Sequence, residues 1–323
     1  MVLVATAPPH PVGGRDYPRT LAEFNHWFPG EAACLACLAY LERLRWPAGF
    51  VCSKCGGTRG WHLSRERLRC AACRAETSLT AGTIFADTRL PLTTWFAATW
   101  YVTNQKSGIS ALGLQRALGL NRYETAWAIL HKLRRAMVRH GRDKLGGELE
   151  VDESYVGGPE PGKRGRGALG KAIVAIAAEA LPRGALGRIR LARIPNCSQD
   201  VLSDFVAEVA EPGSVIYTDH WSGYNGLAAA GFLRHPTNIA ASGDPAHVAM
   251  PRVHRVASLL KRWLLGTHHG GISARQLDFY LDEFVFRFNR RQSRSRGLLF
   301  YRLLEQAVQL DHVMVREIVG GRP

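Results

Sequence analysis

The sequence has no long hydrophobic run, comparatively few acidic residues and an odd number of cysteines, and each of these features argues against a class of protein. No apolar stretch reaches the roughly 18–20 residues that a helix needs to cross a bilayer, which argues against a membrane protein. Seven cysteines cannot all pair in disulfides, so we expect a reducing cytoplasm rather than a disulfide framework. The start of the chain lacks the basic flank of a secretion signal and is typical of a disordered Pro/Gly tail.

Lysine and arginine outnumber aspartate and glutamate by 42 to 27, so the net charge is +15. An excess of this size favours a polyanionic partner such as nucleic acid, although many basic proteins bind nothing specific. The 323 residues are enough for two or three domains. We predict a disordered tail (1–19), a cysteine module (20–85), a helical segment (86–146), an α/β domain with a C-terminal basic helix (147–310) and a second tail (311–323).

Four cysteines stand in two close pairs, Cys52-x2-Cys55 and Cys70-x2-Cys73. Each pair lets two thiolates of one tight turn reach the same ion, and two such pairs complete a tetrahedral site. The sequence therefore predicts a structural zinc ribbon with a short hairpin over 61–69.

A further pair, Cys34 and Cys37, falls in a helical pattern over 31–44. Cysteines three residues apart on such a helix are usually small buried hydrophobes. We assign this pair no zinc, and its role stays open. Cys197 stands alone in the sequence and is expected to be structural.

Two helices are predicted over 109–118 and 123–139, joined by a turn in which Asn121 caps the second helix. A short helix, a turn and a basic helix is the order of a helix-turn-helix element, but a plain helical linker with a solvated basic face fits equally well. On the first alternative, the exposed arginines Arg134 and Arg135 contact DNA.

From residue 148 onward the sequence predicts a mixed α/β domain. Its order, three strands, a helix, two strands and a helix, is ribonuclease H-like, with the first strand beside the fourth. Asp152 lies on that first strand and Asp219 ends the fourth, so the carboxylates lie on neighbours about 4.8 Å apart. Such a pair can hold Mg²⁺ or Mn²⁺ for phosphoryl transfer, although an aspartate at a strand end is often only a turn residue. The predicted elements are strands over 148–156, 171–178, 188–194, 215–219 and 235–239, and helices over 199–209 and 253–265.

A series of motifs extends this interpretation along residues 20–310. They are Arg45-Trp-Pro47, Ala81-Gly-Thr-Ile-Phe85, Asp152-Glu-Ser-Tyr-Val-Gly-Gly158, Tyr217-Thr-Asp219, Leu260-Lys-Arg-Trp263 and Arg287-Phe-Asn-Arg-Arg291. In this order they resemble insertion-sequence transposases of the ISXO2-like type, the IS1595 group. The resemblance implies a DDE-type transposase that nicks DNA at terminal inverted repeats with water and then joins the freed 3′-hydroxyl to target DNA. It also implies a dimer or larger assembly on DNA, in the cytoplasm at the nucleoid.

His254 departs from the pattern of this family, because many members carry a glutamate seven residues before the lysine that matches Lys261. A helix puts His254 and Lys261 on one polar strip. Three alternatives stand for His254: a third metal ligand, a contact to the scissile phosphate, or the mark of a decayed and inactive copy. Lys261 is expected to hold DNA phosphate as a point charge.

Two further basic segments, a Gly/Pro-rich loop over 157–170 and an arginine-rich run over 287–296, are expected to contact DNA phosphates. The residues concerned are Lys163, Arg164 and Arg166 in the loop, and Arg290, Arg291 and Arg294 in the run.

Two other functions compete with transposition. A zinc-ribbon DNA-binding protein without catalysis, either a regulator or an inactive transposase copy, explains the cysteines and the charge but gives no reason for the two aspartates. A structure-selective nuclease of the same fold would cut branched DNA without joining strands.

Overall fold

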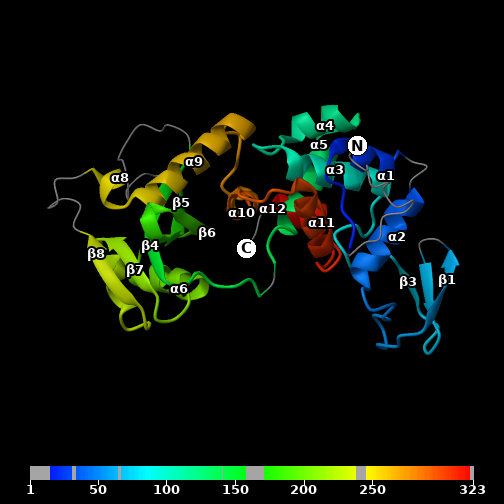
Figure 1. Ribbon diagram of the computed structural model, residues 1–323, viewed down its shortest axis with the longest axis horizontal. Helices are drawn as coiled ribbons and strands as arrows, with labels where there is room; N and C mark the ends of the chain where they lie inside the picture. Colours follow the sequence, from blue (N-terminus) through cyan, green and yellow to red (C-terminus); the bar gives the residue numbers. More distant parts are fainter. Residues whose placement is uncertain are drawn as a thin grey trace, which may run out of the picture. The chain divides into compact units, whose positions relative to one another are not determined.

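The computed structural model describes residues 15–30, 34–64, 67–139, 141–157, 171–237 and 245–320 (Figure 1). By packing, the chain divides into one unit of residues 1–139 with 293–318 and a second unit of residues 140–292 with 319–323. The elements of the first unit are α1 (Leu21–Trp27), α2 (Cys34–Arg45), β1 (Gly60–Ser64), β2 (Arg67–Cys70), β3 (Glu76–Ser78), α3 (Leu92–Asn104), α4 (Ala111–Leu118), α5 (Tyr123–Arg135) and α11 (Arg296–Ala307).

The elements of the second unit are β4 (Glu148–Val156), β5 (Ala172–Ala180), η2 (Pro182–Gly184), β6 (Leu186–Ile194), α6 (Gln199–Val209), β7 (Val215–Asp219), η3 (Ser222–Leu227), β8 (Leu233–Thr237), α8 (Ala246–Ala249), α9 (Pro251–His268) and α10 (Leu277–Asn289). The last helix, α12 (Val315–Gly320), crosses the boundary between the units. None of the helices within these described ranges is both long and apolar enough to cross a membrane.

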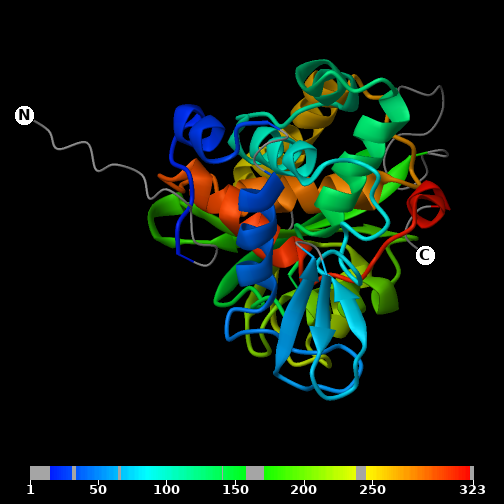
Figure 2. The same ribbon diagram turned by 90° about the vertical axis from the view of Figure 1, so that its right-hand side faces the viewer.

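The cysteine module is a small antiparallel sheet in the order β1-β2-β3 (Figure 2). The predicted hairpin over 61–69 is confirmed, because β1 pairs with β2 there. At the end of α2, the guanidinium of Arg45 donates to the carbonyls of Ser78 at 3.1 Å and Ala81 at 2.6 Å. Two of the motifs that carry the family resemblance, one beginning at Arg45 and one at Ala81, therefore meet in space.

Aromatic rings hold the helical part of the first unit together. The Phe24 ring stacks on Trp100 with centroids 5.0 Å apart, and Phe28 meets Phe96 edge-on at 4.8 Å. Phe300 of α11 packs against the same group of rings, so α11 belongs to this core. The domain bounds at 19, 85, 146 and 310 stay predictions.

Helices α4 and α5 follow the predicted helix, turn, helix order. The Ser110 hydroxyl accepts from the amide of Gly113 and caps α4, and Gly119 ends it in the left-handed conformation at φ 62°. The predicted cap by Asn121 is wrong, because the N-cap of α5 is Arg122 and no side chain caps that helix. Whether this pair enters a DNA groove stays a prediction.

The second unit is built on a five-stranded sheet in the order β6-β5-β4-β7-β8, which confirms the ribonuclease H-like arrangement. Strands β4, β5 and β6 pair antiparallel, while β7 and β8 join in parallel. Helices α9 and α10 cover one face of the sheet and α6 the other (Figure 1). Along β4 the side chains of Leu149 and Val151 pack on the α6 side, so Glu150 and Asp152 face α9.

Candidate active site and metal centre

The register between β4 and β7 brings Asp152 and Asp219 together. In this parallel pair Glu150 lies opposite Tyr217, and each aspartate stands two residues further along its own strand. Because side chains alternate with a period of two, both aspartates lie on the face of the sheet that α9 covers. Neighbouring strands are about 4.8 Å apart, so the two aspartates stand on adjacent strands of the same sheet face.

Each aspartate is oriented by a backbone amide close by. The amide of Glu153 donates to Oδ1 of Asp152 at 2.8 Å, and the amide of Trp221 donates to Oδ1 of Asp219 at 3.1 Å. These bonds help to hold the two carboxylates in place beside the sheet.

His254 joins this pair from α9. Its Nε2 lies 3.8 Å from Oδ2 of Asp152, and the two side chains are 31% and 18% exposed. Both side chains are therefore partly exposed, whereas the Nε2 atom of His254 itself is buried. Within the described ranges, the four ribbon cysteines are the only group of three or more possible metal ligands whose ligand atoms all lie within 4.8 Å of one another. Asp152, Asp219 and His254 therefore form a looser group than the cysteines.

Glu150 anchors the start of α9 and was missed by the sequence reasoning. Its side chain is buried, and Oε2 accepts from the backbone amides of Arg252 at 2.7 Å and Val253 at 3.0 Å. Its Oε1 accepts from the Arg252 guanidinium at 2.7 Å. A carboxylate at a helix N-terminus satisfies orphan amides and the helix dipole, and Pro251 occupies the first turn. The sequence did hold a signal for this residue, because Glu150 stands two residues before Asp152 and so lies on the same face of the strand.

Tyr224 is a second residue that the sequence reasoning missed. It is fully buried on the α6 side, and its hydroxyl donates to Oε1 of Glu153 at 2.8 Å. Burial, followed by the charges of Glu153 and Asp152, raises the pKa of Tyr224 well above its ordinary value. The contact confirms that Glu153 points to the face opposite Asp152.

The exposed side of α9 is basic and includes Lys261. This lysine lies seven residues, about two turns, after His254 and is exposed, as are Arg255 and Arg262. The helix contains no acidic residue, whereas its buried side is apolar through Val256 and other residues. An exposed basic strip on the helix that carries His254 is suited to phosphate contacts.

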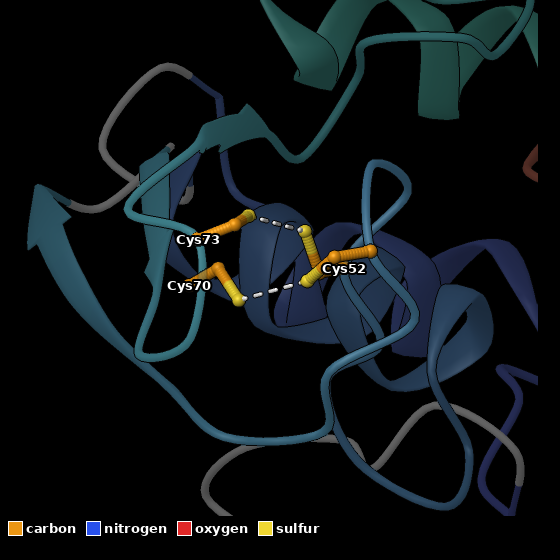
Figure 3. A group of neighbouring side chains, drawn as sticks. Cys52, Cys70 and Cys73 are labelled. Atoms are coloured by element: carbon orange, nitrogen blue, oxygen red, sulfur yellow. Dashed lines mark hydrogen bonds between the residues drawn. The ribbon is translucent and has the colours of Figure 1, made fainter.

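The four ribbon cysteines turn their sulfurs toward one point (Figure 3). The sulfurs of Cys52 and Cys73 lie 3.7 Å apart, and those of Cys55 and Cys70 lie 3.6 Å apart. Tetrahedral zinc with bonds of about 2.3 Å sets its sulfurs about 3.8 Å from one another, so this spacing fits the ion. The backbone amide of Cys73 lowers the pKa of Cys70 to about 7, which favours the thiolate that zinc requires.

The remaining cysteines lie elsewhere. Cys37 is fully buried in α2, as predicted for a small hydrophobe, and the side chain of Cys34 lies outside what the structure describes. Cys197 is half-buried in the second unit.

The arginines predicted on the basic face of α5 have different surroundings. Arg134 is only 1% exposed, with Nη1 3.3 Å from Nε2 of His131, so the prediction that it lies on a solvated face is wrong. The reason is that α5 packs against both α3 and α4, which leaves it a narrow exposed side. Lys132 is buried too, and donates to the carbonyl of Ile84 at 3.3 Å. Arg135 is half-buried and keeps solvent contact.

The arginines at the end of α10 lie on aromatic rings. The guanidinium carbon of Arg290 lies 4.0 Å from the centroid of Phe286, and that of Arg291 lies 4.2 Å from the centroid of Phe288. Arg291 also donates to two carbonyls at the start of β6, which ties α10 to the sheet. Arg291 and Arg294 are exposed, and Arg290 is half-buried. The predicted contacts of Lys163, Arg164 and Arg166 fall outside the described residues.

Comparison with known proteins agrees with both the α/β domain and the zinc ribbon. Residues 144–289 match the ISXO2-like transposase domain, and residues 35–76 match the transposase zinc-ribbon domain. Together the two matches take in more than half of the chain. An uncharacterised protein in transposable element ISH50 of Halobacterium salinarum is 25% identical over 268 residues, which are 76% of this chain and 88% of that protein.

Two solved structures are also similar. The catalytic core domain of BIV integrase is 13% identical, with 47% of this chain and 89% of that chain covered and a TM-score of 0.31. A chain of the simian T-cell lymphotropic virus intasome, solved with the PP2A regulatory subunit B56 gamma, is 13% identical, with coverages of 58% and 70% and a TM-score of 0.31. The ribonuclease H-like fold is seen in the strand order β6-β5-β4-β7-β8.

Proposed function

Because the chain belongs to the IS1595 group of insertion-sequence transposases, we propose that it nicks DNA at the terminal inverted repeats of its element and joins the freed 3′ ends to target DNA. The observation that supports this proposal is the register of β4 and β7, which puts Asp152 and Asp219 on neighbouring strands, each two residues beyond the pair Glu150 and Tyr217. A protein that only binds DNA has no need of that pair.

Asp152 and Asp219 are the residues that would hold catalytic Mg²⁺ or Mn²⁺, with His254 as a third ligand. Carboxylate oxygens are the ligands these ions prefer. When bound, the ions would activate the attacking oxygen and stabilise the leaving one. Of the three alternatives for His254, the metal ligand is supported by its position, since Nε2 is aimed at the Asp152 carboxylate.

The chain's own residues orient and neutralise the DNA. Lys261 holds a phosphate near the scissile bond, and Arg255 and Arg262 extend the same strip along α9. The lone charge of a lysine suits this contact, because it attracts phosphate without imposing a bidentate geometry. Arg135, Arg290 and Arg294 are further phosphate contacts, whereas the buried Arg134 is not proposed as one.

Zinc in the ribbon is structural, because four thiolates close its coordination shell. Joining two ends of an element requires that both be held at once, so a dimer or larger assembly on DNA is part of the proposal. The protein would act in the cytoplasm, at the nucleoid when it is bound to DNA.

The test uses zinc-loaded full-length protein and DNA carrying one end of the element. Wild-type protein nicks that end in Mg²⁺ or Mn²⁺ and joins pre-cleaved ends to a target duplex. Asp219→Asn nicks about a thousandfold more slowly, because several kcal/mol of charge stabilisation are lost. Asp204→Asn, an exposed aspartate on α6, is the matched control and nicks normally.

The outcomes separate the competing functions. Sequence-specific binding without cleavage in any divalent ion would support the regulator or inactive copy. Cleavage of branched DNA without joining would support the nuclease. Normal nicking by Asp219→Asn would overturn the assignment of the active site.

A further inference from the structure

Strand β1 of the zinc ribbon leaves large apolar side chains uncovered. It is the edge strand of its sheet, and all five of its residues are exposed. Trp61 and Leu63 are 40% and 41% exposed, so each leaves a large part of its surface in water. Single exposed apolar side chains are common on protein surfaces, so the neighbours of Trp61 decide what this surface can bind.

The pairing of the strands shows which side chains share this surface. Trp61 lies directly opposite Arg69 on β2, and Arg69 lies opposite Glu76 on β3. Residues that face each other across an antiparallel pair point to the same side, and so do alternate residues along a strand. Arg67 therefore joins that side, while His62 and Leu68 belong to the opposite one. A bulge between His62 and Ser64 interrupts the alternation at Leu63.

Cations surround the exposed tryptophan. The guanidinium carbon of Arg74 lies 5.3 Å from the centroid of the Trp61 ring. Glu76, bonded to Arg69 and 3.7 Å from Arg67, is the one acidic residue in the described stretches 49–64 and 67–80. The cations in those same ranges are Lys54, Arg59, Arg67, Arg69 and Arg74. The surface is thus apolar at its centre and positive at its rim.

We propose that this ribbon face, formed by Trp61, Arg67, Arg69 and Arg74, binds DNA at an unpaired base of the element end. Trp61 stacks on that base, and the arginines contact phosphates on either side. An aromatic ring flanked by cations is the combination that suits unpaired DNA, since an unpaired base offers a stacking face and every linkage a negative charge. This inference rests on the proposed function in one respect, namely that the DNA it binds is the end of the element.

The experiment measures fluorescence anisotropy of a labelled duplex that carries the element end with a short single-stranded overhang, titrated with zinc-loaded protein. Trp61→Ala weakens binding about tenfold, which is the scale of one lost base contact. His62→Ala is the matched control, because His62 is the next residue on the same strand but points to the other side, 3.2 Å from Glu42. That variant binds like wild type. Zinc content and melting temperature show that both variants are folded.

The arginine rim makes a separate prediction with the same assay. Arg74→Ala weakens binding and lowers the slope of log affinity against log salt by about one, as expected for one lost phosphate contact. Trp61→Ala leaves that slope unchanged, because an uncharged ring releases no counterions. The two variants therefore distinguish the two kinds of contact.

Two results would overturn the proposal. One is equal DNA affinity for Trp61→Ala and His62→Ala. The other is a concentration-dependent dimer, seen by sedimentation, that Trp61→Ala dissociates without any change in DNA affinity, since the face would then be an interface between two copies. Catalysis is tested separately, with the nicking assay and Asp219→Asn. If the wild-type protein does not nick but Trp61→Ala still weakens DNA binding, the DNA-binding face stands and the proposed activity fails.

Discussion

The Nε2 atom of His254 lies 3.8 Å from Oδ2 of Asp152, although one residue belongs to helix α9 and the other to strand β4. Two residues earlier on each element, Glu150 accepts hydrogen bonds from the amide and the guanidinium of Arg252. The strand and the first turn of the helix are therefore joined at two successive points. The contact between Glu150 and Arg252 holds the first turn of α9 against β4. Glu150 therefore sets where His254 stands relative to the two aspartates.

Replacing His254 tests its role directly. His254→Ala should slow nicking about a hundredfold, because the third group of the site is lost. His254→Glu should restore most of the rate in Mg²⁺, since a carboxylate oxygen suits that ion better than an imidazole nitrogen. Nicking rates in Mg²⁺ and Mn²⁺ provide the measurement. A phosphate-contacting histidine predicts the opposite, because a glutamate there would repel DNA and be slower than alanine.

Removing the charge of Glu150 should misplace His254. Glu150→Gln weakens three charge-assisted bonds to α9, which should lower the free energy of unfolding by about 2–4 kcal/mol and slow nicking about tenfold or more. The matched control is Glu179→Gln, because Glu179 likewise binds an arginine side chain and the amide of the same residue, Arg188. It should lose comparable stability and keep its nicking rate at a temperature where both variants are folded.

A double variant separates positioning from a general loss of stability. If Glu150 acts through His254, Glu150→Gln combined with His254→Ala should nick no more slowly than His254→Ala alone. Additive losses would contradict that link and leave Glu150 a purely structural residue.

Zinc removal should unfold the ribbon. Cys70→Ser takes one thiolate from the tetrahedral site, and about 10 kcal/mol of folding free energy is associated with such sites. We expect the bound zinc and the ribbon's share of amide-exchange protection to disappear. Cys197→Ser, a half-buried cysteine of the second unit, should keep a full equivalent of zinc and serves as the control. Full zinc in Cys70→Ser would contradict the ligand assignment.

Lys261 should contribute charge rather than shape to DNA binding. Lys261→Ala should weaken affinity and lower the salt slope by about one, whereas Lys261→Arg should keep the slope. Leu265→Ala, on the next turn of α9 and equally open to solvent, should change neither quantity. Identical salt slopes for wild type and Lys261→Ala would remove this lysine from the DNA contacts.

Local pattern was enough to predict much of the second unit. The predicted bounds of β4, α6 and β7 match the structure, because each is a short apolar-periodic segment ended by polar or turn residues. The prediction that Asp152 and Asp219 lie on neighbouring strands agrees with the order of β4 and β7 in the sheet.

What the sequence could not predict depended on packing between distant segments. Arg134 resembles a solvated helix residue, and only the contacts of α5 with two other helices show that it is buried. The bonds from Glu150 to Arg252 and from Tyr224 to Glu153 join elements far apart in the chain, and no periodicity reports such pairs. The exposure of Trp61 was equally hidden, since tryptophans usually pack in cores.

The most direct test of the account is anomalous X-ray diffraction from crystals of the protein soaked in Mn²⁺. The account predicts an anomalous peak within bonding distance of a carboxylate oxygen of Asp152 and one of Asp219, and no such peak in crystals of Asp219→Asn. Manganese bound away from both aspartates, or a peak that persists unchanged in that variant, would contradict it.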